Sequence, residues 1–180
     1  LKISTVALVW TLPLDGMTTD RALLWSVVRR GCRGAPNLGA IVRRLDDLYG
    51  ASVSTDCLKL GETHVLEARL EVPSDYFLPG GAHALDRALG FLRDLVCRPV
   101  VEGCGLRRDF VEQERTNCRR FLESLRNDKT EYAGERARAL MCAGEPFSRC
   151  ENGALEELDR PTPETLASLH DGLVRSAPQR

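Results

Sequence analysis

One segment limits the possible folds of this chain more than any other, the predicted helix over residues 19–30. Its apolar side chains lie almost all the way round the helix axis instead of along one stripe. Because a helix that is apolar on most sides has to be covered on most sides, this segment must lie inside a core that other elements build around it. Its apolar side chains are Ala22, Leu23, Leu24, Trp25, Val27 and Val28.

The rest of the chain supplies both strands and helices for that core. β-branched and aromatic residues predict a strand over 2–12, and alternating apolar residues predict two more over 51–59 and 62–72. The last two strands are joined through Leu60 and Gly61 as a hairpin, which makes the sheet at least partly antiparallel. This order of elements is typical of an α+β two-layer domain. Apolar periodicity predicts the other helices over 36–48, 82–97, 106–126, 129–142 and 163–174.

Length and charge narrow the classes of function. With 180 residues, the chain is about the size of one domain and can bury a hydrophobic core without disulfides or metal. Its 25 Lys and Arg residues nearly balance its 26 Asp and Glu residues, so no net positive charge favours nucleic acid or an anionic membrane. No apolar run approaches the ~18 residues that would span a bilayer. We therefore expect neither nucleic acid nor a membrane as a partner.

The cysteines and histidines form no known metal or catalytic motif. The cysteines number seven and never occur in a C-x-x-C spacing, which favours reduced thiols in a cytoplasmic protein. Metal binding by Cys97 with Cys104, or by Cys142 with Cys150, is the less favoured alternative. The three histidines are isolated from one another, so we expect a structural or surface role for each of them.

Glu114 is the residue with the most unusual predicted environment. It falls in the middle of the apolar arc of the helix expected over 106–126. A carboxylate on such a face costs several kcal/mol unless it is paired or points into a cavity. Either Glu114 pairs with an arginine of a neighbouring element, which is the simpler interpretation, or it is what remains of an acidic site.

A series of short motifs follows in a fixed order along the chain. The motifs are Thr11-Leu12-Pro13-Leu14-Asp15, Ala22-Leu23-Leu24, Arg30-Gly31, Leu45-Asp46-Asp47-Leu48-Tyr49-Gly50-Ala51, Gly61-Glu62, Phe91-Leu92 with Pro99, Phe110-Val111 with Glu114-Arg115, Asn127-Asp128-Lys129 with Tyr132-Ala133 and Arg136, Glu145-Pro146-Phe147, and Gly153 with Leu155. Each motif alone is weak, but their order and spacing over nearly the whole chain resemble the insulinase/pitrilysin superfamily of zinc peptidases. The chain most resembles the bacterial non-catalytic branch of that superfamily, whose members are encoded beside a catalytic sister.

Active members of this superfamily carry H-x-x-E-H on the first helix. The two histidines bind zinc, the glutamate activates water, and a distant glutamate on a later helix completes the site. When the chain is aligned on Arg30-Gly31, the general base falls on Trp25. On the later helix, Glu114-Arg115 matches the first acidic position of the family pattern, and the distal ligand, seven residues further on, falls on Phe121. The resemblance therefore implies no catalytic residue, no bound metal and no cofactor in this chain, with zinc only in a catalytic partner. The five motif positions are occupied by Ala22, Leu23, Leu24, Trp25 and Ser26.

The resemblance also implies a fold and a role. The fold would be that of mitochondrial processing peptidase and LuxS-like metallohydrolases, a two-layer α+β domain with a mixed, largely antiparallel sheet and helices on one face. Residues 1–180 would form a single insulinase-like peptidase domain near the N-terminus of a longer multi-domain chain. We expect a proteolytically inactive subunit that pairs with a catalytic homologue, or forms a homo-oligomer, and helps to form a peptide-binding chamber. Trp25 and Glu114 are its candidate chamber or peptide contacts.

Two other functions fit the same residues. In the first, the segment belongs to an active zinc-dependent endopeptidase whose metal site lies outside it. In the second, the domain only assists assembly and touches no peptide. Dependence of peptide cleavage on this chain and on a partner separates the three hypotheses.

Overall fold

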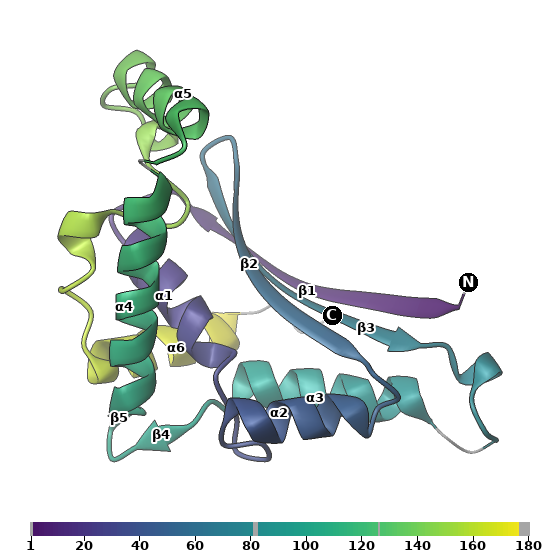
Figure 1. Cartoon of the computed structure of the whole chain (residues 1–180). Coiled ribbons are helices and arrows are strands. Elements are labelled where there is room, and N and C mark those ends of the chain that lie inside the picture. Colours follow the sequence, from purple (N-terminus) through teal and green to yellow (C-terminus); the bar gives the residue numbers. More distant parts are fainter. Residues whose placement is uncertain (1, 81–82, 126, 177–180) are drawn as a thin grey trace. The chain divides into compact units, whose positions relative to one another are not determined.

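The computed structural model describes residues 2–80, 83–125 and 127–176 of the chain (Figure 1). Predicted helix ends at residues 82 and 126 lie outside the described residues. The strands are β1 (Ile3–Pro13), β2 (Ser52–Leu60), β3 (Thr63–Pro73), β4 (Val101–Glu102) and β5 (Gly105–Leu106). The α-helices are α1 (Thr18–Val28), α2 (Leu38–Asp46), α3 (Ala84–Cys97), α4 (Arg108–Leu125), α5 (Lys129–Met141) and α6 (Pro163–Ser176). Three short 3₁₀ helices are η1 (Asp75–Phe77), η2 (Pro146–Ser148) and η3 (Leu155–Glu157).

The three long strands form one antiparallel sheet in the order β1-β3-β2. The amide of Leu14 donates to the carbonyl of Glu62 at 2.9 Å, and the amide of Ser74 donates to the carbonyl of Lys2 at 2.9 Å. The end of β1 therefore meets the start of β3, and the start of β1 meets the end of β3. The predicted hairpin of β2 and β3 is present, and its turn residue Gly61 has a φ of +57° that suits glycine. The expectation of a largely antiparallel sheet is confirmed.

The central strand shows that one face of the sheet is covered. In β3, His64, Leu66, Ala68, Leu70 and Val72 are buried, whereas the residues between Leu66 and Val72 on the other face are half-buried or exposed. The outer strands β1 and β2 alternate between half-buried and exposed positions along their whole length. Alternation of this kind is typical of a sheet with helices on one face and solvent on the other. The predicted two-layer α+β class is confirmed.

The chain divides into two compact units, and the three long strands contribute to both. The first unit contains residues 2–9, 28–56 and 67–100 among those described. Its helices are α2 and α3, and its buried apolar residues include Ile41 of α2 together with Phe91 and Leu95 of α3. Asn37 explains why α2 begins later than predicted, because its side chain caps the helix by accepting the amide of Ala40 at 2.9 Å.

The second unit contains residues 10–27, 57–66 and 101–176 among those described. Its helix α6 packs against β5, and α4 packs against β5, α5 and η3. A Cβ atom on Gly105 would lie 2.9 Å from the Cβ of Pro163, so this close approach of β5 to α6 requires glycine.

A small hairpin lies between two of the predicted helices, where no strand is predicted. It is the antiparallel pair of β4 with β5, which Gly103 and Cys104 connect. Gly103 has a φ of +63°, which glycine adopts without strain in a tight turn. Two residues per strand are too few to produce a visible alternation, so the sequence pattern did not reveal this hairpin.

Among the residues that the structure describes, no helix combines the length and the apolar character needed to cross a membrane.

Candidate functional site

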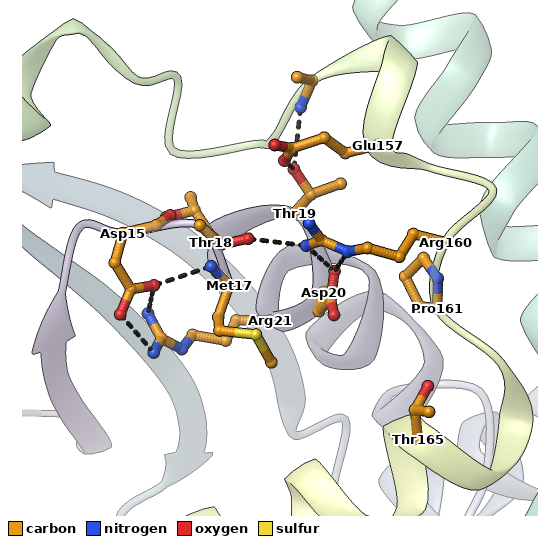
Figure 2. Close-up of polar contacts among 12 residues, drawn as sticks. Asp15, Met17, Thr18, Thr19, Asp20, Arg21, Glu157, Arg160, Pro161 and Thr165 are labelled. Atoms are coloured by element: carbon orange, nitrogen blue, oxygen red, sulfur yellow. Dashed lines mark hydrogen bonds and ion pairs between the residues drawn. The ribbon is translucent and has the colours of Figure 1, made fainter. Parts of the chain in front are cut away.

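Helix α1 contains the positions that match the zinc motif, and a network of charged residues holds its start. The carboxylate of Asp15 accepts the amide of Met17 at 2.8 Å and pairs with Arg21 at 3.0 Å (Figure 2). Arg21 also donates to the carbonyl of Pro13 at 2.7 Å. Burial raises the pKa of Asp15, but the hydrogen bonds from Met17 and Arg21 outweigh it and hold this pKa below its usual value. Asp15 is therefore ionised, and the hydrogen bond that it accepts from Met17 and its ion pair with Arg21 stabilise the turn between β1 and α1.

Residues 153–160 cover the same helix start from a distant part of the chain. The hydroxyl of Thr19 donates to Glu157 at 2.5 Å and accepts the amide of Ala154 at 3.1 Å. Arg160 pairs with the buried carboxylate of Asp20 at 2.5 Å, as Figure 2 shows. These contacts satisfy polar side chains of the first turn of α1 that would otherwise be buried without partners. We call residues 153–160 the α1 cover.

The five positions that match the zinc motif carry no metal ligand and are packed into the core. Ala22, Leu23, Leu24 and Trp25 are buried, and Ser26 is half-buried. The ring of Trp25 packs edge-on against Trp10 of β1, with 5.2 Å between the ring centroids. The indole nitrogen of Trp10 donates to the carbonyl of Leu173 in α6 at 3.3 Å. An edge-on pair of indoles therefore occupies the position that the resemblance aligns with the general base of active members.

Helix α4 lies next to this part of α1. The Sγ atom of Cys118 is 3.9 Å from the hydroxyl of Ser26, which joins the two helices at the C-terminal end of the motif. Glu114, one turn earlier on α4, is only 2% exposed and accepts a hydrogen bond from Asn117 at 3.1 Å. Phe121, the residue at the predicted distal-ligand position, is 47% exposed.

The residues on α1 and α4 do not fit a zinc ion. Zinc in such sites is bound by imidazole, thiolate or carboxylate groups from at least three residues. Among the described residues, no group of three or more His, Cys, Asp or Glu side chains is arranged to hold a metal ion. This applies to the pairs Cys97 with Cys104 and Cys142 with Cys150 as well, whose thiols are all free. No hydrolytic step can be derived from these side chains.

The predicted peptide contacts, Trp25 and Glu114, are both 2% exposed in this chain. A side chain that is buried to this extent cannot touch a bound peptide without a rearrangement of its surroundings. Their contact with a peptide remains a prediction, and their contacts within the chain support structural roles, with Trp25 packing against Trp10 of β1 and Glu114 accepting a hydrogen bond from Asn117 within α4.

A buried polar cluster around His64 is a feature that the sequence did not reveal. His64 is fully buried, and its Nε2 atom lies 3.0 Å from the carbonyl oxygen of Glu151. Burial lowers the pKa of His64, although the Glu151 carbonyl partly offsets this effect. The Nζ atom of Lys59 donates to the carbonyl of Arg149 at 2.7 Å and lies 3.6 Å from the Glu151 carboxylate. The only signal in the sequence is that Lys59 and His64 occupy positions of the hairpin on the covered face of the sheet.

Solved structures define the fold of this chain. It superposes on a conserved protein from Enterococcus faecalis V583 with a TM-score of 0.88 at 23% identity, over 96% of this chain and 41% of that one. It superposes on a peptidase M16 inactive domain from Pseudomonas fluorescens with a TM-score of 0.73 at 17% identity, over 94% of this chain and 38% of that one. The chain therefore has the fold of a peptidase M16 inactive domain.

A curated relative agrees with this class. The chain is 33% identical over 177 residues to the "Probable inactive metalloprotease YmfF" of Bacillus subtilis (strain 168). The match covers 97% of this chain and 42% of the relative, so the chain spans less than half of the relative's length. No family model matches the chain. The sequence thus relates the chain to a probable inactive metalloprotease, and its fold is that of a peptidase M16 inactive domain.

Proposed function

We propose that this chain is a proteolytically inactive peptidase-like domain that pairs with a catalytic homologue and helps to form a peptide-binding chamber. The single observation that carries the proposal is the packing of residues 22–26. Four of these five side chains are buried, and none is a histidine or a carboxylate. The probable inactive metalloprotease relative and the shared fold support the inactive peptidase-like part of this proposal.

Trp25 has a packing role at the position where the resemblance places the general base of active members. Its edge-on contact with Trp10 buries two large apolar rings and ties α1 to β1. A glutamate at this position would need a partner in a region that contains apolar side chains on most sides. The packed indole at this position therefore takes the space that a catalytic glutamate and its partner would need.

The sheet supports a role in peptide binding. β1 and β2 are the outer strands of the three-stranded sheet. An extended peptide can pair with an outer strand through backbone hydrogen bonds, and pockets for alternate side chains then supply specificity. We propose that a peptide substrate binds along such an edge, and that zinc is present only in the catalytic partner. We also propose a cytoplasmic location, because the seven cysteines are compatible with reduced thiols.

The test is a peptide-cleavage assay on the full-length protein, alone and together with a catalytic homologue. The zinc content of the same untagged samples is measured by elemental analysis. We expect no cleavage and no tightly bound zinc for the protein alone, and cleavage that depends on this chain when the partner is present.

Two results would contradict the proposal. Cleavage by the protein alone, with one zinc per chain, would favour the active endopeptidase whose metal site lies outside residues 1–180. Cleavage by the partner that does not change when this chain is omitted would favour a domain that only assists assembly.

A further inference from the structure

A small cavity is lined by residues of α4, α5 and the start of the α1 cover. Helices α4 and α5 can be followed in Figure 1. The volume of the cavity is about 160 Å³. A cavity of roughly 150 Å³ is large enough to hold a benzene-sized group. The residues that line it include Leu122, Leu125, Tyr132, Glu135, Leu155 and Glu156.

The lining combines an apolar wall with an aromatic ring and two carboxylates. Leu122, Leu125 and Leu155 supply the apolar wall, and Tyr132 supplies a ring that is 41% exposed. Glu135 is paired with Arg138, so the charge of its carboxylate is largely balanced. The side chain of Glu156 is exposed, and no hydrogen bond or ion pair is described for it within the part of the chain that the structure covers. The cavity therefore presents one uncompensated negative charge.

The walls of the cavity contribute no further charge. Cys150 also lines it, and burial raises the pKa of the Cys150 thiol, with the nearby Glu151 and Glu135 carboxylates adding to the effect. The thiol is therefore neutral at physiological pH. None of the described side chains of α5 is buried, so this helix leaves its side of the cavity accessible.

We propose that this cavity binds the side chain of an arginine or lysine in a peptide. The methylene groups of such a side chain would pack against the leucines, and its charge would lie near Glu156 and the ring of Tyr132. A neutral apolar side chain would gain the first contact but not the second, and an acidic one would be repelled by Glu156. The proposal rests on the proposed function only in that a peptide supplies the side chain.

The experiment compares two blocked tripeptides by NMR titration of the ¹⁵N-labelled 180-residue chain. Acetyl-Ala-Arg-Ala-amide carries the charge, and acetyl-Ala-citrulline-Ala-amide has nearly the same shape without it. We expect the arginine peptide to shift the amide signals of 122–125 and 150–156 and to bind about three- to five-fold more tightly, as an exposed charge pair allows. Equal binding of the two peptides, or shifts confined to other residues, would overturn the proposal.

Three variants make the test specific. Glu156→Gln should remove the preference for the arginine peptide, whereas Glu62→Gln, an exposed glutamate in the turn between β2 and β3, should retain it. Leu155→Phe fills the cavity and should weaken the binding of both peptides, with circular dichroism to verify that it folds. If Glu156→Gln binds the arginine peptide as well as the original chain does, the proposal is wrong.

The outcome is independent of the cleavage assay. If the chain shows no preference for the arginine peptide but cleavage still depends on the chain, the cavity proposal is wrong and the proposed function stands. Arginine-selective binding without any effect of the chain on cleavage would support the cavity and reject the chamber.

Discussion

At the scale of single residues, Gly153 decides whether the α1 cover can approach the helix it covers. Its φ is +90°, and a Cβ atom placed there would lie 2.8 Å from the Cα of Thr19. The atom it would meet belongs to the backbone, so a side-chain movement cannot relieve the clash. The hydrogen bond between Thr19 and Glu157 depends on this close approach.

We predict that Gly153→Ala lowers the free energy of unfolding by about 2–4 kcal/mol, because a left-handed backbone and a backbone clash add together. Urea denaturation followed by circular dichroism measures the change. Gly172→Ala is the control, since Gly172 is exposed within α6 and nothing lies within 4 Å of its added Cβ. That control should be more stable by about 0.5–1 kcal/mol. Equal stability of the two variants would contradict this account of Gly153.

His64 is the second residue whose local environment has a measurable consequence. Because its Nε2 atom faces a carbonyl oxygen, Nε2 carries the proton of the neutral ring. The other ring nitrogen, Nδ1, is buried and has no hydrogen-bond partner among the described residues. A protonated His64 would therefore bury a donor without an acceptor, with Arg21 adding repulsion.

The pKa of His64 is lowered from its ordinary value of 6.5, so the unfolded chain binds this proton more readily than the folded chain. The contribution of neutral His64 to the free energy of unfolding is fully present above pH 6.5 and is lost as the pH falls below that value. The free energy of unfolding then falls by up to about 1.4 kcal/mol per pH unit. Urea midpoints between pH 7.5 and 5 measure this slope. His64→Gln cannot titrate and should show a smaller slope, whereas an unchanged slope would contradict the assignment. Asp15 does not interfere, because its lowered pKa places its titration below 3.8.

At the scale of elements, α1 is the helix around which the second unit is built. Its cross-element contacts include the ring pair of Trp25 with Trp10 and the cover formed by residues 153–160. The helix has no amphipathic stripe, so its stability comes from being surrounded and not from one packed face.

Trp25→Ala should therefore destabilise the chain by about 3–5 kcal/mol, which is typical for removal of a large buried ring. The chain has two tryptophans, so the near-UV circular dichroism signal of the coupled rings should also be lost. Tyr76→Ala is the matched control, because Tyr76 is 88% exposed and its loss should change stability by less than about 0.5 kcal/mol. A small effect of Trp25→Ala would show that the indole pair does not hold α1 in place.

At the scale of the whole molecule, the proposed pairing and chamber formation would involve more than the residues described above. The described chain divides into two compact units that share the strands of one sheet. It spans 42% of the curated relative, so a larger protein is the natural object of the cleavage assay. A net charge of −1 supplies no strong long-range electrostatic attraction toward a partner, so any association would depend on local contacts.

The sequence by itself determined the long elements and the absence of a zinc motif. The predicted strands and helices agree with the structure to within about two residues at most ends, because apolar periodicity over ten or more residues is a strong local signal. The apolar circumference of residues 19–30 correctly indicated a buried helix, and Leu60-Gly61 correctly indicated the hairpin. Absence of histidine from residues 1–63 is visible without any structure.

Only the tertiary structure decided which distant residues meet. The contacts of Thr19 with Glu157, Asp20 with Arg160 and His64 with Glu151 span between 87 and 140 positions, and no local pattern encodes them. The short hairpin of β4 and β5 and the cavity beside α5 depend on such contacts too. Local sequence sets the conformation of a segment. A polar group can be buried only where the tertiary structure places a hydrogen-bond partner beside it, and in these contacts that partner comes from a distant part of the chain.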